Sequence, residues 1–496
     1  MATRAPLADH KVLETPHSLT LLSEKLHRFF TLPAGDSLEI LHYVLLPGIK
    51  GREESQIVAV TGSPGMPFSW LISALPQGQS LPSLAPTRPV FLWPEREMHD
   101  RSGLPIKDHP DLRPLLFPEK VSLKGIAHGS GSFHLPLGPV RGDVGESLHY
   151  LFDLIGEQIM FLESQLFYKH RDLESLAVNR TPEEALVLAE RVAGVSSVAH
   201  ASAFVRAVEQ AAGRTVSLRV EYERLLLGEM ERLYNHARDL ALLAGSTGMT
   251  VGQAQLARVQ EELLRFNGDL TGSRYLRGTV KLGQSSSIPW PSLIPGIQAR
   301  LEPIAQRLKK FTSLLAKTPT FTDRLKTTGR VEYAWIQAYD LVGPVARAAG
   351  LARDVRQDHF PALLDLGPWQ IAVITEEPGD AFARFLVRVR EWHQSYALLC
   401  YGLFKLADPN WGQEPVLWPS GTSPSGWGIG LSESPRGRTS HLIRLQDNGR
   451  IAFWHIHSAS ACNWPVFGLA TSNGNIQTDF PIIEASFSLN AASCDR

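Results

Sequence analysis

Cysteine is scarce in this 496-residue chain, and its scarcity excludes the simplest cysteine-based sites. The three cysteines, Cys400, Cys462 and Cys494, are far apart in the sequence, and no two of them form a CxxC pair. An odd and scattered set of this kind argues against a disulfide framework and against a structural zinc site. It favours a reducing, cytoplasmic setting.

Long hydrophobic runs and net charge are also lacking. The first residues contain no apolar core of a signal peptide, and no later window holds the roughly 18 uncharged apolar residues that a membrane span needs. We therefore expect no direct membrane span, so that any contact with a membrane is made through another subunit. The 49 basic and 50 acidic residues give a formal net charge of -1, which provides no reason to expect a nucleic-acid partner.

The N-terminal part has the pattern of a small mixed domain. Short runs rich in Val, Ile, Leu and Phe between residues 38 and 92 are separated by Gly, Pro and Ser clusters, which predicts a compact α+β unit. The charged segment 93–119, which is interrupted by prolines, is interpreted as an ordered extended arm that closes this unit.

From residue 144 onward the pattern is typical of long packed helices. Residues 215–243 and 298–317 carry apolar residues at three- and four-residue spacing between charged ones. Thr181-Pro182-Glu183-Glu184 has the form of a capping box, which predicts a helix start. Segment 283–296, with three prolines and four serines, predicts a loop, and Asp447-Asn448-Gly449 predicts the turn of a β-hairpin.

These patterns define an α+β fold class. We expect a small N-terminal α/β domain at residues 1–120, followed at residues 121–496 by a large, mainly helical domain with peripheral β-hairpins.

Ordered motifs carry a resemblance to a known family. Segment 93–119 resembles the end of the 30-kDa subunit of complex I, through Glu95-Arg96-Glu97, Asp100, Gly103 and the run from His109 to Arg113. The rest of the chain is similar to the nickel–iron hydrogenase large subunit and to the 49-kDa subunit of complex I, through PLGPVRGD, FYKHRDLESLA, ERVAGVSSVAH, GEMERLYNHARDL, VGPVARAAGLARDVRQDH, PGDAFARFLVRVREW and SESPRGR. The fusion of both parts resembles the large subunit of group 4, energy-converting hydrogenases of the formate hydrogenlyase type.

The resemblance implies a large subunit of a membrane-associated, complex I-like or energy-converting hydrogenase-related oxidoreductase complex. Such a subunit would lie on the cytoplasmic side of the inner membrane and would dock an iron–sulfur small subunit that carries a 4Fe-4S cluster. It would couple electron transfer to antiporter-like, ion-pumping membrane subunits. Two alternatives remain: a structural or regulatory paralogue without electron transfer, and a quinone-reducing subunit of the NADH dehydrogenase type.

The nickel ligands of that family are missing. The resemblance implies two cysteine pairs whose four thiolates hold nickel and iron, because these metals need soft, bridging, anionic ligands. Here Ala193 and Ser196 stand at the first pair. At the second pair, Ala491 or Ala492 stands at the first position, and Cys494 is the one candidate for the other. We therefore predict no metal and no cofactor in this chain.

The quinone chemistry of complex I also lacks its proton donors. The resemblance places Arg141 and Gly145 at the two histidine positions of the quinone loop, and Gly194 at the tyrosine position. The candidate pocket residues are therefore the remaining charged or titratable groups around the lost centre: Arg141, Asp143, Glu146, Arg191, His200 and Arg436.

Each of these candidates has a purely structural alternative. Buried arginines commonly hold carboxylates in two-pronged pairs, and an internal ion-pair network is expected among Arg347, Arg353, Asp354, Asp380, Arg384, Arg388 and Glu391. His170, Arg171 and His236 resemble positions near the partner's iron–sulfur cluster, although His236 is equally well interpreted as a core histidine. His455 and His457, two apart on a predicted strand, are expected to face solvent.

Overall fold

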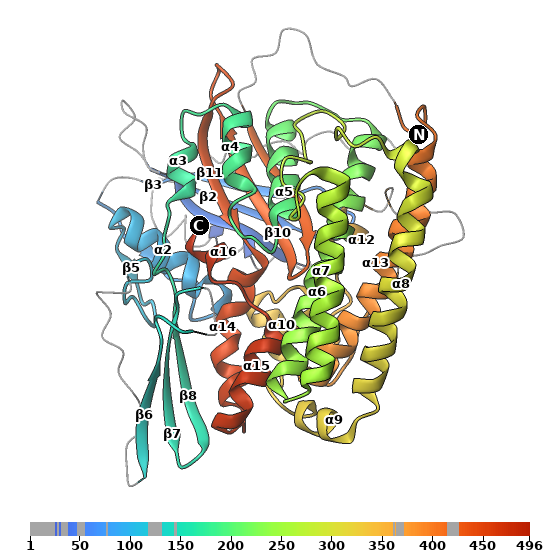
Figure 1. Cartoon of the computed structure of the whole chain (residues 1–496). Helices are drawn as coiled ribbons and strands as arrows, with labels where there is room; N and C mark the ends of the chain where they lie inside the picture. The colour runs from blue at the N-terminus through green and yellow to red at the C-terminus, as the bar shows by residue number, and fades with distance from the viewer. Residues whose placement is uncertain are drawn as a thin grey trace.

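The computed structural model describes residues 25–26, 29–30, 38–46, 55–75, 78–117, 131–142, 146–360, 363, 372–413 and 426–496. Strands gather on one side of the molecule and long helices on the other (Figure 1), which confirms the predicted α+β class. Asp143 and Gly145, both singled out in the sequence, lie outside the described residues.

A three-stranded antiparallel sheet forms in the N-terminal part, where the sequence predicts strands. Its members, in spatial order, are β1 (Glu39–Leu46), β2 (Ser55–Gly62) and β3 (Ser69–Leu75). One face packs on helix α2 (Leu92–Ser102), and the other face packs on a second sheet. Because both faces are covered, the strands consist of nearly continuous apolar runs, as buried sheets require.

Segment 93–119 does not form an extended arm throughout, so that prediction is wrong in its first part. A 3-10 turn, η2 (Pro89–Phe91), leads directly into α2. Glu95 lies in the first turn of α2, where the helix dipole favours negative charge, and Gly103 ends the helix in the left-handed conformation that glycine adopts without strain.

The second sheet contains β9 (Trp427–Ser434), β10 (Gly437–Leu445) and β11 (Ile451–His457), in the order β11-β10-β9. The pairing of β10 with β11 confirms the predicted hairpin. The sheet is not peripheral, however, because it lies between β1–β3 and helix α5 (Ser197–Ala211). Gly430 permits this close packing, since a methyl group there would lie 1.9 Å from the carbonyl oxygen of Ala203.

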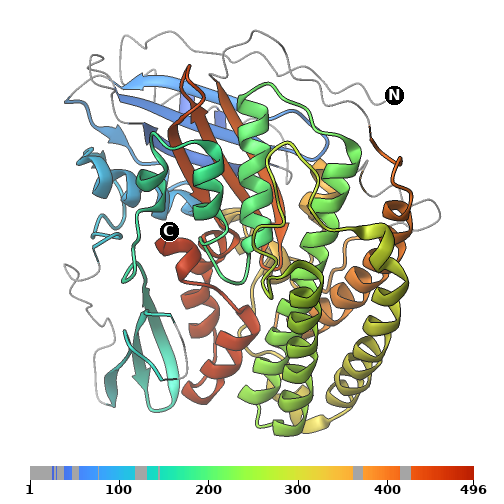
Figure 2. The same cartoon turned by 45° about the horizontal axis from the view of Figure 1, so that its top comes forward.

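Long helices form the other side of the molecule. These are α6 (Leu218–Ser246), α7 (Thr250–Thr271), α8 (Trp290–Ala316) and α13 (Ala381–Ala407), which pack along one another (Figure 2). They confirm the helices predicted at 215–243 and 298–317. The loop predicted at 283–296 is wrong in its second half, because a proline in the first turn of a helix loses no intrahelical hydrogen bond and α8 already begins there.

A third antiparallel sheet projects from the body (Figure 1). It contains β6 (Ser132–Leu137), β7 (His149–Ile155) and β8 (Gln158–Gln165), and it packs on α14 (Ala459–Ser472) and α15 (Phe480–Phe487). The ring of Phe480 contacts Tyr150 and Phe152 edge-on, with centroids 5.0 and 4.7 Å apart.

Short elements complete the described fold. The predicted capping box begins α4, because Thr181 and Glu184 each accept a hydrogen bond from the backbone N–H of the other. The short elements are β4 (Leu81–Pro82), β5 (Ile106–Lys107), α3 (Leu173–Ala177), α4 (Pro182–Ala189), α9 (Pro319–Leu325), α10 (Tyr333–Tyr339), α11 (Gly343–Arg347), α12 (Val355–His359), η5 (Gln477–Asp479) and α16 (Ala492–Asp495). None of the helices in the described part of the chain combines the length and hydrophobicity needed to cross a membrane.

Candidate functional site

The two segments that resemble the hydrogenase metal motifs lie against each other. The guanidinium of Arg171 donates to the carbonyl oxygens of Arg191 and Val192, at 2.8 Å each, and to that of Ala492 at 2.9 Å. A planar guanidinium suits this role because it presents several donors in fixed directions. One side chain therefore joins the loop after α4 to the C-terminal helix α16, and we take this junction as the candidate site.

Helix α6 supports the junction with three polar residues spaced by four. Glu231, Asn235 and Asp239 form one stripe, since four residues make slightly more than a helical turn. The Glu231 carboxylate accepts hydrogen bonds from the backbone N–H groups of Val198 and Ala199, in the first turn of α5, at 2.7 and 3.0 Å. Asn235 donates to the carbonyl oxygen of Val195 at 2.8 Å. Burial raises the pKa of Glu231 to about 8. The sequence analysis missed this stripe, although its spacing in GEMERLYNHARDL could have revealed it.

Arg436, in the turn between β9 and β10, points at the same stripe. Its guanidinium lies 2.7 Å from Asp239, 3.2 Å from the Asn235 amide oxygen and 3.0 Å from both the hydroxyl and the carbonyl oxygen of Ser488. Arg388 of α13 faces Asp239 from another side at 3.4 Å. Burial by itself would raise the pKa of Asp239, but the two guanidinium groups outweigh it and lower that pKa.

Glu146 enters the junction from the segment before β7. Its carboxylate accepts hydrogen bonds from the Asn490 amide and from the backbone N–H groups of Ala491 and Ala492. Burial raises the pKa of Glu146, against the opposing effect of these N–H groups. A carboxyl group of the protein therefore contacts Ala491 and Ala492, where the resemblance implies a thiolate.

Arg141 is directed toward α15. It forms a two-pronged ion pair with Glu484 at 2.7 and 3.0 Å, and the Tyr150 hydroxyl donates to the same carboxylate at 3.1 Å. This arrangement differs from the histidine that the resemblance implies at position 141, because a paired guanidinium does not release a proton near neutral pH.

The donor set does not fit a nickel–iron pair. Ala193 and Ala492 present methyl groups, and burial raises the pKa of the Cys494 thiol well above its usual range. The Cys494 sulfur lies 3.7 Å from the Asn490 carbonyl oxygen, the arrangement of a neutral thiol that donates rather than of a thiolate. Across the described residues, no three His, Cys, Asp or Glu side chains are arranged to hold a metal ion.

His200 lies on α5, one turn past Ser196, and is a neutral interior imidazole. The indole N–H of Trp454 donates to Nδ1 of His441 at 3.1 Å, so a neutral His441 carries its proton on Nε2. That nitrogen lies 3.0 Å from Nδ1 of His200 and donates to it. Burial lowers the pKa of His200 to about 3.

Three other predicted positions differ in their exposure. Arg191 does not enter the junction, because its guanidinium is exposed and donates to the Val187 carbonyl oxygen one turn earlier. His170 is half-buried beside the junction, with Nδ1 2.7 Å from the Asp495 carbonyl oxygen. His236 is fully buried and lies 2.9 Å from Glu391; burial lowers its pKa to about 4.

The prediction of a solvated face at His455 and His457 is wrong. Strand β1 covers this face: Nδ1 of His455 lies 2.8 Å from Nδ1 of His42, and Nδ1 of His457 donates to the Leu41 carbonyl oxygen at 2.9 Å. Strand periodicity shows which side chains share a face, but not whether another sheet covers it.

The structure contains an extensive internal ion network, as predicted, but Asp380 and Arg384 take other partners. Arg347 bonds to Glu391 at 2.7 Å and to Glu433 at 2.8 Å. Asp380 accepts the Ala383 N–H and so caps α13. Arg384 instead donates to the Ser486 hydroxyl and to a backbone carbonyl, and burial lowers its pKa to about 9.

Three family models match successive parts of the chain. The model for the 30 Kd subunit of respiratory-chain NADH dehydrogenase matches residues 42–128, and the model for its 49 Kd subunit matches residues 247–420. Between them, the nickel-dependent hydrogenase model matches residues 171–239. The fold and the matched segments define a large subunit of the hydrogenase and complex I class.

Two curated relatives extend over most of the chain. Formate hydrogenlyase subunit 5 of Escherichia coli (strain K12) is 29% identical over 448 residues, with 84% of this chain and 77% of the relative covered. Hydrogenase-4 component G of the same organism is 30% identical over 448 residues, with 84% and 76% covered. This chain therefore belongs to the group 4 hydrogenase and complex I large-subunit family, in the form that fuses the 30 Kd and 49 Kd modules.

A solved structure shows the same fold. It is described as the membrane-bound sulfane sulfur reductase (MBS), an archaeal respiratory membrane complex, and it aligns with a TM-score of 0.65 and 22% identity over 74% of this chain and 99% of the matched chain.

Proposed function

We propose that this chain serves as the large subunit of a membrane-bound, complex I-like oxidoreductase complex whose nickel–iron centre has been replaced by a closed protein junction. The observation that carries the proposal is the insertion of Glu146 beside Ala491 and Ala492, while Arg171 and Arg436 keep the surrounding segments together. The fold and the polar surroundings of the centre are retained, and the ligands are not.

Electrons would arrive from an iron–sulfur small subunit docked beside the junction. His170 and Arg171 lie in the loop before α3, next to α16, and His170 is partly accessible there. The identity of the chain's relatives, which include a membrane-bound hydrogenase subunit alpha of Pyrococcus furiosus and NADH-quinone oxidoreductase subunits D, supports such an assembly. Peripheral association with the cytoplasmic face, through antiporter-like membrane subunits, is part of the same proposal.

Glu146 is the group best placed for proton exchange at the junction. Its carboxylate is largely buried, and burial raises its pKa, so that it takes up a proton more readily than an exposed glutamate. Negative charge that arrives on a neighbouring cluster would favour the protonated form further. Proton donation of the complex I type by a histidine and a tyrosine is not part of the proposal, because Arg141 and Gly194 occupy those positions.

Purification of the chain with its co-encoded partners tests this function. We expect an iron–sulfur subunit to copurify and to show a reducible 4Fe-4S signal in electron paramagnetic resonance. The midpoint potential of that cluster should depend on pH in the wild-type complex and depend on it less in Glu146→Gln; the exposed Glu157→Gln serves as the matched control. If no iron–sulfur subunit copurifies, the redox proposal fails and a structural or regulatory paralogue is left.

A further inference from the structure

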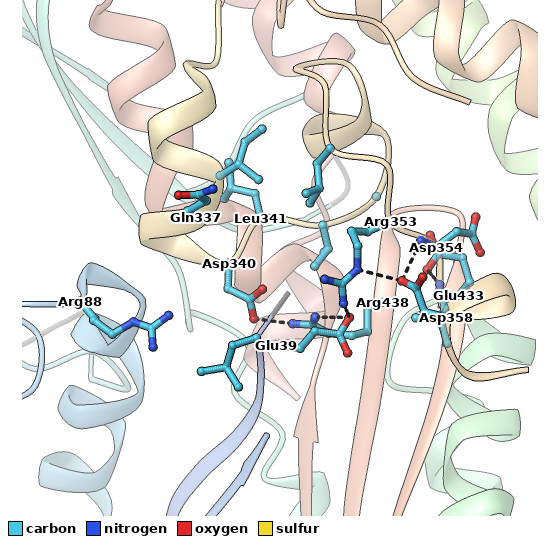
Figure 3. Close-up of a pocket in the computed structure, with 16 residues that line it drawn as sticks. Glu39, Arg88, Gln337, Asp340, Leu341, Arg353, Asp354, Asp358, Glu433 and Arg438 are labelled. Atoms are coloured by element: carbon cyan, nitrogen blue, oxygen red, sulfur yellow. Dashed lines mark hydrogen bonds and ion pairs between the residues drawn. The ribbon is translucent and has the colours of Figure 1, made fainter. Parts of the chain in front are cut away.

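A charged cavity lies where the N-terminal sheet meets the larger part of the chain, away from the junction. Its volume is about 160 Å³, room for several water molecules, and residues of β1, α10, α12, β9 and β10 line it (Figure 3). Figure 3 shows Glu433 and Asp354 at one end, and Arg88 and Gln337 at the other. Neither the proposed function nor the resemblance assigns this cavity a role.

The end of the cavity at Glu433 and Asp354 belongs to an ion network that has one more carboxylate than guanidinium groups among the described residues. Among the described residues, the network contains within ion-pairing distance three guanidinium groups, of Arg232, Arg347 and Arg356, and four carboxylates, of Glu229, Asp354, Glu391 and Glu433. All seven side chains are buried. His236 lies 2.9 Å from Glu391 but adds no positive charge near neutral pH, because burial lowers its pKa to about 4. An uncompensated buried charge is costly, so a network of this composition favours the uptake of one proton.

The hydrogen bonds indicate which carboxylate takes that proton. Asp354 accepts two hydrogen bonds from the Arg356 guanidinium, at 2.9 and 2.7 Å. Glu391 accepts one from the Arg347 guanidinium at 2.7 Å and lies 2.9 Å from His236. Glu433 accepts one hydrogen bond from the Arg347 guanidinium at 2.8 Å and one from the backbone N–H of Val355 at 3.2 Å. Asp354 competes for the same Arg347 nitrogen at 3.6 Å. Burial, together with the charge on Asp354, raises the pKa of Glu433.

The groups that surround Glu433 support the conclusion that this carboxylate takes up the proton. Arg347 Nη2 and Arg232 Nη1 are buried without a hydrogen-bond partner among the described residues, so the network has two N–H donors to which water can bind. The charged groups that face Glu433 or share the cavity with it are Arg347, Asp354, Arg356, Arg232, Arg438, Glu39, Asp340, Arg353, Asp358 and Arg88.

We propose that the cavity is a water-filled proton reservoir and that Glu433 is its exchange site. One proton passes from a cavity water to a carboxylate oxygen of Glu433, which becomes neutral, and the reverse step returns it; no other bond changes. Glu433 stands three residues before Arg436 on the strand that leads to the junction. The idea that this reservoir supplies protons to the junction rests on the proposed function. Proton exchange between the cavity and Glu433 does not.

Infrared difference spectroscopy of the full chain tests the exchange without partners or turnover. Between pH 5 and 9 the wild type should lose one protonated-carboxyl component with a midpoint of about 7 that Glu433→Gln lacks. Glu95→Gln is the matched control, because burial also raises the pKa of Glu95 to about 7, but that carboxyl does not line this cavity. In D₂O the Glu433 component should exchange within the mixing time and the Glu95 component more slowly.

A second variant keeps the test decisive if Glu433→Gln fails to fold. Asp354→Asn removes the neighbouring negative charge, so the Glu433 midpoint should move to lower pH. The proposal is overturned if the wild type and Glu433→Gln give the same titration, or if the Glu433 component exchanges as slowly as that of Glu95. It is also overturned if replacing choline with sodium shifts the midpoint, because that shift would indicate a metal-cation site. The result is independent of whether an iron–sulfur subunit copurifies, so failure here and failure of the proposed function can be told apart.

Discussion

The guanidinium of Arg436 lies 2.7 Å from the carboxylate of Asp239, and Ser488 bonds to both of them. The sequence predicts Arg436 as a pocket residue. Here the residue is held by α6 and by the C-terminal segment, so its positive charge is balanced within the protein. The same contact therefore joins α6 to the C-terminal segment and stabilises the fold.

Removal of Arg436 should destabilise the chain strongly. Arg436→Met leaves Asp239 buried with Arg388 as its remaining close cation, and breaking one partner of a buried pair costs about 3–5 kcal/mol. Urea unfolding should show a loss at the lower end of this range, because Arg388 compensates in part. Arg238→Met is the control: Arg238 is 41% exposed and 3.9 Å from Asp239, so its loss should cost less than about 1 kcal/mol. Equal losses of unfolding free energy in the two variants would contradict the conclusion that Arg436 is the main partner of Asp239.

Removal of Arg171 should loosen both segments of the junction together. Arg171→Ala leaves the carbonyl oxygens of Val192 and Ala492 without their guanidinium donor. Hydrogen exchange measured by mass spectrometry should accelerate in peptides that cover 191–200 and 488–496. The loss in stability should be about 0.5–1.5 kcal/mol, because the Arg171 side chain is exposed and water can replace part of its bonding. Arg191→Ala, which removes only an exposed contact within one helical turn, should leave both peptides unchanged. Acceleration in one peptide alone would show that Arg171 does not couple them.

The buried histidines make the fold sensitive to acid. Burial and the neighbouring Arg438 lower the pKa of His457 to about 4, whereas the unfolded chain has the ordinary value of 6.5. The unfolded state therefore binds the proton first as the pH falls, and the free energy of unfolding decreases between about pH 6.5 and 4. At pH 5 this one group contributes a loss of about 2 kcal/mol.

His457→Asn should reduce this loss while retaining a donor for the Leu41 carbonyl oxygen. The measurement is urea unfolding at pH 8 and pH 5, compared with the wild type. An unchanged difference between the two pH values would mean that His457 is already protonated in the folded protein at pH 5.

Local chemistry decided which elements were predictable from the sequence. The capping box at Thr181 and the turn at Asn448 depend on neighbouring residues alone, and both predictions are confirmed. The helix at Leu92–Ser102 falls in a segment for which the sequence predicts an extended arm, because the charges of the helix and the prolines that follow it resemble those of a loop.

Features that depend on contacts between distant segments could not be predicted from local sequence. The burial of His455 depends on β1, more than 400 residues earlier, and the contact of Glu146 with Ala491 joins segments 345 residues apart. Motif resemblance directs attention to the loop at Ala193 and Ser196, because the order of the motifs along the chain matches that of the family. The domain boundary at residue 120 and the roles of the junction residues stay predictions.

Metal analysis of the complex purified with its co-encoded partners tests the central claim most directly. Inductively coupled plasma mass spectrometry should find iron at about four atoms or a multiple of four per complex, from clusters in the partner subunits. It should find nickel far below one atom per chain, because Ala193, Ser196 and Ala492 do not supply thiolates. Nickel at one atom per chain, accompanied by hydrogen uptake, would contradict the claim that this large subunit has lost its nickel–iron centre.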